Sequence, residues 1–254
     1  MEVKNIFLIF SALLLLTKTC NGRFVVSVIE YEFGNIETAT VKCGGTIISN
    51  RNVLTTAACV NVTSPDLSIG VQYLAFNGTA TVPIRHRATV RIHPDFASNR
   101  EYNVAVLEIE GSFGDGFESL SLGALNDSQS CFLYGWGGGN GPADPRRESV
   151  TVNGPDSCPG DNTQAYCSRF GFFEALARCP GLLPGSPLVC GDERVVNGMV
   201  LNGGCSAAQP YLYYHSIEDF SSWILWETAG AEMTTKVSGF LLFAALLTCL
   251  KNIL

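Results

Sequence analysis

Hydroxyl groups are common in this chain, but imidazoles that could activate them are few. Hydrolysis by a serine needs a hydroxyl nucleophile, an imidazole that takes its proton, and a carboxylate that holds the imidazole in the right tautomer. The most noticeable hydroxyl belongs to Ser186, which lies between two cysteines in the segment CPGLLPGSPLVC. The chain has three histidines, His86, His93 and His215. A serine hydrolase would have to bring one of these imidazoles next to Ser186.

Short apolar runs broken by turn residues make up most of the chain between residues 23 and 216. Typical runs are FVVSVIEY, NVAVLEI and YLYYHS, and the chain contains 26 glycines and 11 prolines. This spacing favours an all-β sandwich or barrel. One helix is predicted in the segment IEDFSSWILWE, because Ile217, Phe220 and Ile224 recur at helical spacing.

The charge balance excludes one class of protein. Charged residues make up 15% of the chain, the net charge is -7 and the pI is about 5.0. A nucleic-acid binder needs a basic face for phosphates, so we expect no nucleic-acid partner. In PIRHRATVRIH, Arg85, Arg87 and Arg91 fall on one side of an alternating strand. They could hold an acidic glycan or form an ordinary solvated face.

The first residues of the chain have the pattern of a secretory signal peptide. Residues 1–22 combine a short leader with Lys4, an apolar run from Ile6 to Leu16, and small or polar residues up to Gly22. The apolar run is too short to span a membrane. We therefore expect a secreted, extracellular protein.

A second apolar run lies near the other end, in residues 228–254. Small residues after Thr228 and a polar spacer precede the run from Val237 to Leu250. This is the pattern of a glycosylphosphatidylinositol (GPI) attachment signal, and Ala229 is the expected attachment residue. A short transmembrane helix and a plain extension are the alternatives, because Lys251 follows a run that is short for a span. Anchoring on the outer cell surface therefore stays open.

The cysteines and the sequons also indicate export. Of ten cysteines, Cys20 lies in the expected signal peptide and Cys249 in the tail, which leaves eight. An even number in an exported chain implies disulfides, although the count alone does not give the pairing. Asn-X-Ser/Thr sequons at Asn61, Asn77 and Asn126 are candidate glycosylation sites.

Several motifs in a fixed order resemble those of the trypsin/chymotrypsin (S1) family of serine proteases. The segment CGGTIISNRNVLTTAAC is similar to the one that carries the family's catalytic histidine. It is followed by HPDF, YNVAVLEI, CFLYGWG, CPGLLPGSPLVC, GMVLNGGC and SWI. The resemblance implies that residues 23–227 fold as one trypsin-like domain of two six-stranded antiparallel β-barrels with a C-terminal helix. An active site would lie at the seam between the barrels.

The same resemblance implies a pairing for all eight remaining cysteines. The implied disulfides are Cys43–Cys59, Cys131–Cys190, Cys158–Cys167 and Cys179–Cys205.

At the three catalytic positions, the resemblance implies that no catalytic group is present. Ala58 occupies the histidine position and Asn103 the aspartate position. The nucleophile segment has one residue more than the family spacing, so the serine position falls on Leu183 or on Pro184, depending on the end from which it is counted.

Ser186 lies beyond the nucleophile position in either register, and we expect no histidine beside it. Losing one member of such a triad already costs several orders of magnitude in rate. We therefore expect a chain that is not an enzyme.

The specificity pocket implied by the resemblance is also degenerate. Ala177 falls at the floor of the pocket, Asn202 replaces a tryptophan, and Tyr211 replaces a pocket glycine. The phenol of Tyr211 would fill the pocket; the alternative is that it packs inside the barrel with its hydroxyl paired. The family's calcium loop is not recognisable in LSIGVQYLAFNGTA, which has no carboxylate, and we expect no metal or cofactor.

Taken together, these features predict a non-catalytic serine protease homologue. We expect it to act as a binding partner, cofactor or decoy in an extracellular protease or signalling network, in reproductive fluid or in innate immunity. Its partners would be extracellular proteins such as active serine proteases or their inhibitors. The alternative is a GPI- or membrane-tethered adhesion or receptor component that uses the same fold as a scaffold.

Overall fold

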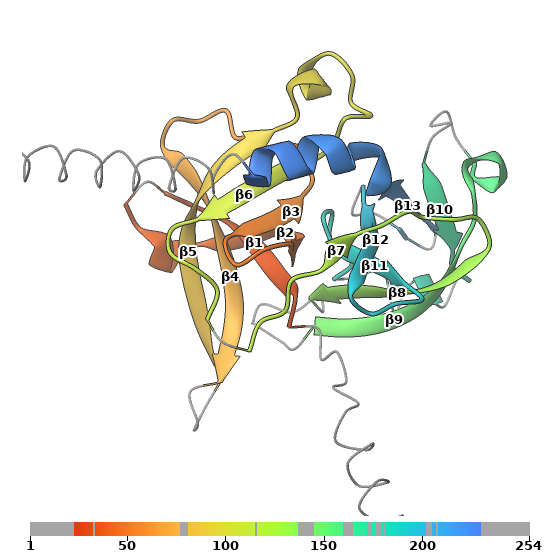
Figure 1. Cartoon of the computed structure of the whole chain (residues 1–254), viewed down its shortest axis with the longest axis horizontal. Helices are drawn as coiled ribbons and strands as arrows, with labels where there is room; N and C mark the ends of the chain where they lie inside the picture. Colours follow the sequence, from red (N-terminus) through yellow and green to blue (C-terminus); the bar gives the residue numbers. More distant parts are fainter. Residues whose placement is uncertain are drawn as a thin grey trace, which may run out of the picture.

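The computed structural model (Figure 1) describes most of the chain between Arg23 and Ala229. The described residues are 23–32, 34–76, 81–114, 116–136, 145–159, 165–171, 174–175, 179, 181–201, 205–206 and 208–229. The expected signal peptide, residues 1–22, and the tail after Ala229 lie outside them.

The first half of the domain is a closed antiparallel barrel of six strands. In barrel order the strands are β1 (Val25–Glu32), β2 (Thr40–Ile47), β3 (Asn52–Thr55), β6 (Ala105–Ile109), β5 (Thr81–Ile92) and β4 (Leu67–Phe76). Alternate residues of these strands point inward and form one apolar core, which includes Val28, Ile47, Val53, Val71 and Leu107. The barrel expected from the sequence is therefore confirmed for this half.

The second half is one curled sheet of seven strands, shown on the right of Figure 1. Its main path runs through β10 (Tyr166–Arg169), β13 (Tyr211–Ser216), β12 (Val195–Val200), β11 (Pro187–Cys190), β8 (Gln129–Trp136) and β9 (Pro145–Val152). The seventh strand, β7 (Ser121–Leu122), pairs with β12 in parallel. The two end strands meet through a single bridge between Asn153 and Cys167. This half therefore has six strands in barrel-like order, as expected, but among the described residues its closure is one bridge and not a full ladder.

Short helical segments connect the strands. They are η1 (Ile36–Thr38), α2 (Ala57–Val60), η2 (Pro94–Ala97), η3 (Pro155–Ser157) and η4 (Glu218–Phe220). The expected C-terminal helix is present: η4 leads directly into a helix over residues 221–229, drawn in blue in Figure 1. Of the described residues, no helix is long and apolar enough to cross a membrane.

A shared apolar core joins the two halves. Leu54, Val104 and Val106 from the first barrel pack with Tyr134 and Val189 from the second sheet, and Phe220 and Ile224 add the end of the chain to the same cluster. The ring of Phe24, just before β1, meets that of Tyr134 edge-on at 4.8 Å between centroids. This packing fixes the relative position of the halves, and with it the geometry of the seam.

The four disulfides of the structure are those that the resemblance implied. They join Cys43 to Cys59, Cys131 to Cys190, Cys158 to Cys167 and Cys179 to Cys205. Each bond removes freedom from the unfolded chain, which is the usual source of stability in exported domains of this kind.

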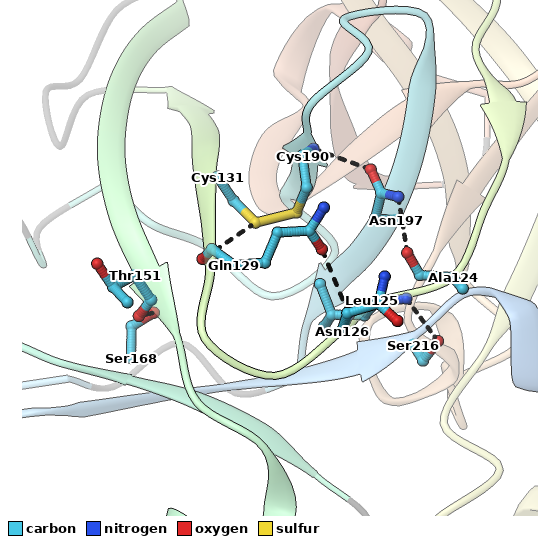
Figure 2. The surroundings of a disulfide bond; sticks show 10 residues. All are labelled: Ala124, Leu125, Asn126, Gln129, Cys131, Thr151, Ser168, Cys190, Asn197 and Ser216. Carbon is cyan, nitrogen blue, oxygen red and sulfur yellow. Dashed lines mark hydrogen bonds between the residues drawn. A yellow bond between two sulfur atoms is a disulfide. The ribbon is translucent and has the colours of Figure 1, made fainter.

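The surroundings of the Cys131–Cys190 bond show how side chains complete the second sheet (Figure 2). The two cysteines lie directly opposite each other on β8 and β11. The register of β11 against β12 shifts at Val189, so Asn197 has no residue opposite it in the ladder. Its side chain replaces the missing bonds, because the Oδ1 atom accepts from the Cys190 N–H at 2.8 Å and Nδ2 donates to Ala124 O at 2.7 Å.

Candidate functional site

Three segments that are distant in the sequence meet at the seam between the two halves. Ala58 lies in α2, directly after β3, and Asn103 lies just before β6. The Ala58 N–H donates to the Asn103 Oδ1 atom at 2.8 Å, and the Asn103 side chain is buried. Asn103 therefore binds the turn that carries Ala58 through a neutral amide. Neither side chain can accept or release a proton at ordinary pH.

The third segment, residues 183–186, is fixed to the first barrel by its backbone. The Gly44 N–H donates to the Pro184 carbonyl at 2.8 Å, and the Thr55 hydroxyl donates to the Gly44 carbonyl at 2.8 Å. Gly185 has φ +82°, a conformation that L-residues with a side chain rarely adopt. A Cβ atom at this position would overlap the Gly44 carbonyl and lie 2.5 Å from the Thr55 hydroxyl oxygen. Only glycine fits at position 185, and the backbones of Gly44 and residues 184–185 are in direct contact.

Ser186 does not face the solvent. Its side chain is fully buried, and its hydroxyl has no hydrogen-bond partner among the described residues. The hydroxyl points at the first barrel, since a Cβ atom added to Gly44 would lie 2.7 Å from it. A nucleophile must reach a substrate, so this orientation does not support a catalytic role for Ser186.

The histidines lie in three other environments. In β5, the His86 Nδ1 atom is 2.8 Å from the Glu110 carbonyl, and Nε2 is 3.1 Å from the Tyr73 hydroxyl. Because a carbonyl only accepts, Nδ1 must carry the proton, and Nε2 accepts from Tyr73. Both ring nitrogens of His86 are therefore used by the first barrel.

His93 and His215 are both associated with the C-terminal end of the domain. The ring of His93 stacks on Tyr102 at 4.7 Å and meets Trp223 at 4.9 Å, and burial lowers its pKa although Asp95 opposes the shift. His215 is buried next to Phe220, and desolvation lowers its pKa to about 4. None of the contacts of these histidines within the described ranges includes Ser186.

Leu183 and Pro184 are the two candidate counterparts of a nucleophile. Both side chains are half-buried, and neither has a hydroxyl. Leu182 next to them is buried in the core of the second sheet. Either assignment leaves this segment apolar.

The structure reaches only part of the expected pocket, because Ala177 and Asn202 lie outside the described residues. Tyr211 is half-buried at the start of β13, whereas its neighbour Leu212 points into the core. Side chains alternate along a strand, so Tyr211 lies on the face of the sheet opposite to that of Leu212. Both the filling of the pocket by Tyr211 and its alternative stay predictions.

The candidate modification sites are exposed wherever they are described. Asn61 follows α2, and Asn126 lies in the turn before β8, where Figure 2 labels it. Ala229, at the end of the described part of the C-terminal helix, is exposed. Asn77 lies outside the described residues. Exposure permits modification, and whether these sites carry sugar or lipid stays a prediction.

Two of the three arginines of β5 contact carboxylates, which disfavours the acidic-glycan interpretation. Arg85 contacts Glu37 at 2.6 Å. Arg91 contacts Glu108 at 2.6 Å and Glu227 at 3.3 Å. Arg87 is exposed. Of the two interpretations, the ordinary solvated face fits better.

Sequence reasoning missed the residues that close the seam, Gly44 and Thr55. Their positions in CGGTIIS and VLTTAAC carried a signal that could have found them. A glycine pair inside a strand suggests a close approach of two backbones, and a buried threonine needs a local acceptor.

Comparisons with known proteins agree with this geometry. The protein-family model described as Trypsin matches residues 26–224. Inactive serine protease 54 from Homo sapiens is 31% identical over 153 residues, covering 54% of this chain and 38% of that protein. Glucanase inhibitor protein 4 from Phytophthora infestans is 36% identical over 103 residues, covering 37% of this chain and 39% of that protein.

A third relative is the inactive serine protease scarface from Drosophila melanogaster. It is 31% identical over 110 residues, covering 39% of this chain and 16% of that protein. The matched segments therefore span well under half of each of these relatives. Two of the three are named inactive proteases, which favours a non-catalytic homologue.

The likeness extends to solved structures. Kallikrein-related peptidase 10 superimposes with a TM-score of 0.61 at 22% identity, over 82% of this chain and 96% of that chain. This likeness establishes the fold. With a family match from residue 26 to residue 224, the chain belongs to the trypsin family.

Proposed function

We propose that this chain is a non-catalytic member of the trypsin family that acts by binding other extracellular proteins. The observation that carries the proposal is the chemistry of the seam, where Ala58, Asn103 and Leu183 or Pro184 offer no imidazole, carboxylate or hydroxyl. Ser186 is buried against Gly44, and the group that binds the Ala58 backbone is the neutral amide of Asn103.

The chemistry of the seam supports this conclusion. Serine hydrolysis needs an imidazole at the nucleophile to take its proton. The described histidines use their rings in the barrel wall or beside the C-terminal helix, and Ala58 has no titratable group. The counterpart of the nucleophile, Leu183 or Pro184, has no hydroxyl to activate.

The relatives suggest what such a protein would bind. Two are named inactive serine proteases, and one is named a glucanase inhibitor. A trypsin-like surface without catalysis is suited to engaging a hydrolase, its zymogen or its inhibitor as a cofactor or decoy. Reproductive fluid and innate immunity are the settings that we propose, because proteases and their inhibitors act there outside the cell.

Export is part of the proposal. A domain joined by four disulfides is typical of oxidising compartments. The signal pattern of residues 1–22 and the exposed sequons at Asn61 and Asn126 point the same way.

A second candidate function is a tethered adhesion or receptor component. The observation that favours it is the apolar run from Val237 to Leu250, which follows the domain after a short spacer. Phosphatidylinositol-specific phospholipase C would release a GPI-anchored form from cells, and protein that stays on cells after treatment would contradict that form of the anchor.

The first test is labelling of the purified protein with a fluorophosphonate probe, with active trypsin as the positive control. We expect no labelling of the wild type, and the same result for Ser186→Ala. If the probe labels the wild type and the Ser186→Ala variant is not labelled, the proposed lack of catalysis is overturned.

The second test is crosslinking of the native protein in the fluid or on the cells that express it, followed by mass spectrometry. We expect a serine protease, its zymogen or its inhibitor to dominate the capture. Receptors, glycans or matrix proteins in their place would favour the adhesion candidate.

A further inference from the structure

The outward face of the C-terminal helix has an unusual composition. Its exposed residues are Ser222, Leu225, Trp226 and Ala229, which we call the outer helix face. Leu225 is 59% exposed and Trp226 is 76% exposed. A helix face that points into water normally carries charged or polar side chains, and this face has no charged residue.

The rotation of the helix is set by contacts on its inner side. Ile224 is buried in the core that joins the two halves, and Trp223 packs against His93. Glu227 is the one charged residue between 221 and 229, and it turns back to the first barrel. There the Arg91 guanidinium donates to the Glu227 carbonyl at 2.8 Å and pairs with its carboxylate. The contact with Arg91 therefore keeps the charge off the outer helix face.

The chain that follows the helix indicates what covers this face. Residues 230–236 separate the helix from the apolar run between Val237 and Leu250. Seven extended residues reach at most about 25 Å. If the run enters a bilayer, or if Ala229 itself carries a lipid, the helix cannot lie farther than this from the membrane surface. The tether raises the local concentration of lipid, so even a small contact becomes populated.

The side chains also fit this occupant. Tryptophan prefers the interfacial zone of a bilayer, and leucine adds apolar area beside it. The exposed acids Glu218 and Asp219 lie at the opposite end of the helix, and the chain carries a net charge of -7. Both facts disfavour an anionic lipid surface and favour a zwitterionic one.

We infer that the outer helix face is a lipid contact, which lies on a zwitterionic membrane surface when the C-terminal tail holds the protein there. The inference rests on the membrane-tethered candidate and is independent of the lack of catalysis. It assigns the tethered domain an orientation, with the end of the helix toward the bilayer and the first barrel above it.

The test uses protein purified from expressing cells with the C-terminus that those cells produce, mixed with phosphatidylcholine vesicles. Flotation of the vesicles reports anchoring. Quenching of tryptophan fluorescence by brominated acyl chains reports contact, and the chain has three tryptophans, at positions 136, 223 and 226. We expect the wild type to float and its emission to be quenched. Trp226→Phe should float equally, with quenching reduced at least about threefold.

Two control variants accompany this measurement. Trp223→Phe should keep the quenching, because Trp223 packs on His93. Val41→Ser removes another exposed apolar side chain, 48% exposed on β2, and should leave both readouts unchanged. Leu225→Ser, by contrast, should lower the quenching of Trp226.

The remaining outcomes separate the two ideas. Flotation with equal quenching in wild type and Trp226→Phe would overturn the lipid contact and leave the anchor intact. A wild type that does not float would overturn both the anchor and the contact, whereas the fluorophosphonate result would be unaffected.

Discussion

The seam between the two halves and the outer helix face both have side chains that are unusual for their positions. The seam lacks the reactive groups of a protease, and the outer helix face carries apolar groups where polar ones are usual. At the seam, where a protease needs reactive side chains, Ala58 and Asn103 carry none that can transfer a proton, backbone contacts join Gly44 to residues 184–185, and the hydroxyl of Ser186 is buried. On the helix, where water-facing polar residues are usual, Leu225 and Trp226 are open to the surroundings. The difference suggests that the surface available to a partner lies at the edge of this fold and not at its centre.

The two regions should also respond differently to mutation. The backbones of Gly44 and Gly185 approach so closely at the seam that no room is left for an added side chain. On the outer helix face, Leu225 and Trp226 keep 59% and 76% of their surface exposed, so substitution there loses little packing. Changes at the seam should therefore cost stability, and changes on the helix face should not.

The largest expected effect is that of Gly185→Ala. The new Cβ atom would overlap the Gly44 carbonyl, and φ +82° is unfavourable for alanine. We expect a loss of more than about 3 kcal/mol in the free energy of unfolding, measured by urea denaturation. Leu225→Ser should change the same quantity by less than about 0.5 kcal/mol.

Gly34→Ala is the matched control for the seam glycine. Gly34 has φ +92°, but a Cβ atom there would meet nothing within 4 Å. Only backbone strain remains, which should cost about 1–2 kcal/mol. Equal losses at Gly34 and Gly185 would mean that the joint at the seam is not tightly packed.

The second effect concerns His215, which lies beneath the start of the C-terminal helix, where Phe220 covers it. Burial lowers its pKa from 6.5 to about 4, so between these pH values the unfolded chain binds a proton that the native protein does not. Stability is therefore complete above pH 6.5 and falls as the pH drops toward 4. The loss amounts to about 3 kcal/mol.

His215→Leu removes this titration. We expect the unfolding free energy of the variant to change less than that of the wild type between pH 6.5 and 4, as measured by urea denaturation at each pH. The lowered pKa of His93 acts in the same direction and remains in both proteins. If the unfolding free energies of the wild type and His215→Leu depend on pH in the same way, His215 has the same pKa in the folded and unfolded chain.

The smallest of the three effects is that of Asn103. Asn103→Ala removes the acceptor of the Ala58 N–H, which should cost about 1–2 kcal/mol and speed amide hydrogen exchange at Ala58. Asn103→Asp keeps an acceptor at the same place and should recover most of the protection. An unchanged exchange rate in Asn103→Ala would mean that this bond does not hold the turn.

Much of this structure could be predicted from the sequence, because cysteines and strand motifs constrain it over long distances. The four disulfides link segments that must be adjacent, and their order matched one family pattern. The apolar runs around Val28, Val53 and Leu107 gave the strands of the first barrel, since their periodicity reports one buried face directly.

Other features depend on tertiary contacts that no local pattern records. Tyr211 follows the strand alternation of β13, and only the burial of its neighbour Leu212 in the assembled core shows which face it takes. Closure of the second sheet depends on the bridge of Asn153 to Cys167, two residues that the disulfide framework brings together. The buried hydroxyl of Ser186 depends on how closely Gly44 approaches, which only the assembled seam defines.

The contact between Arg91 and Glu227 has a mechanical consequence. The chain enters the fold at β1 in the first barrel, crosses to the second sheet, and returns in its last helix to the first barrel. A pull on the C-terminus therefore acts first on the contact between Arg91 and Glu227 and on the core around Ile224, before any strand of the second sheet. A protein held at a surface by its tail would in this way pass tension into its closed barrel, the half of the domain without an open sheet edge.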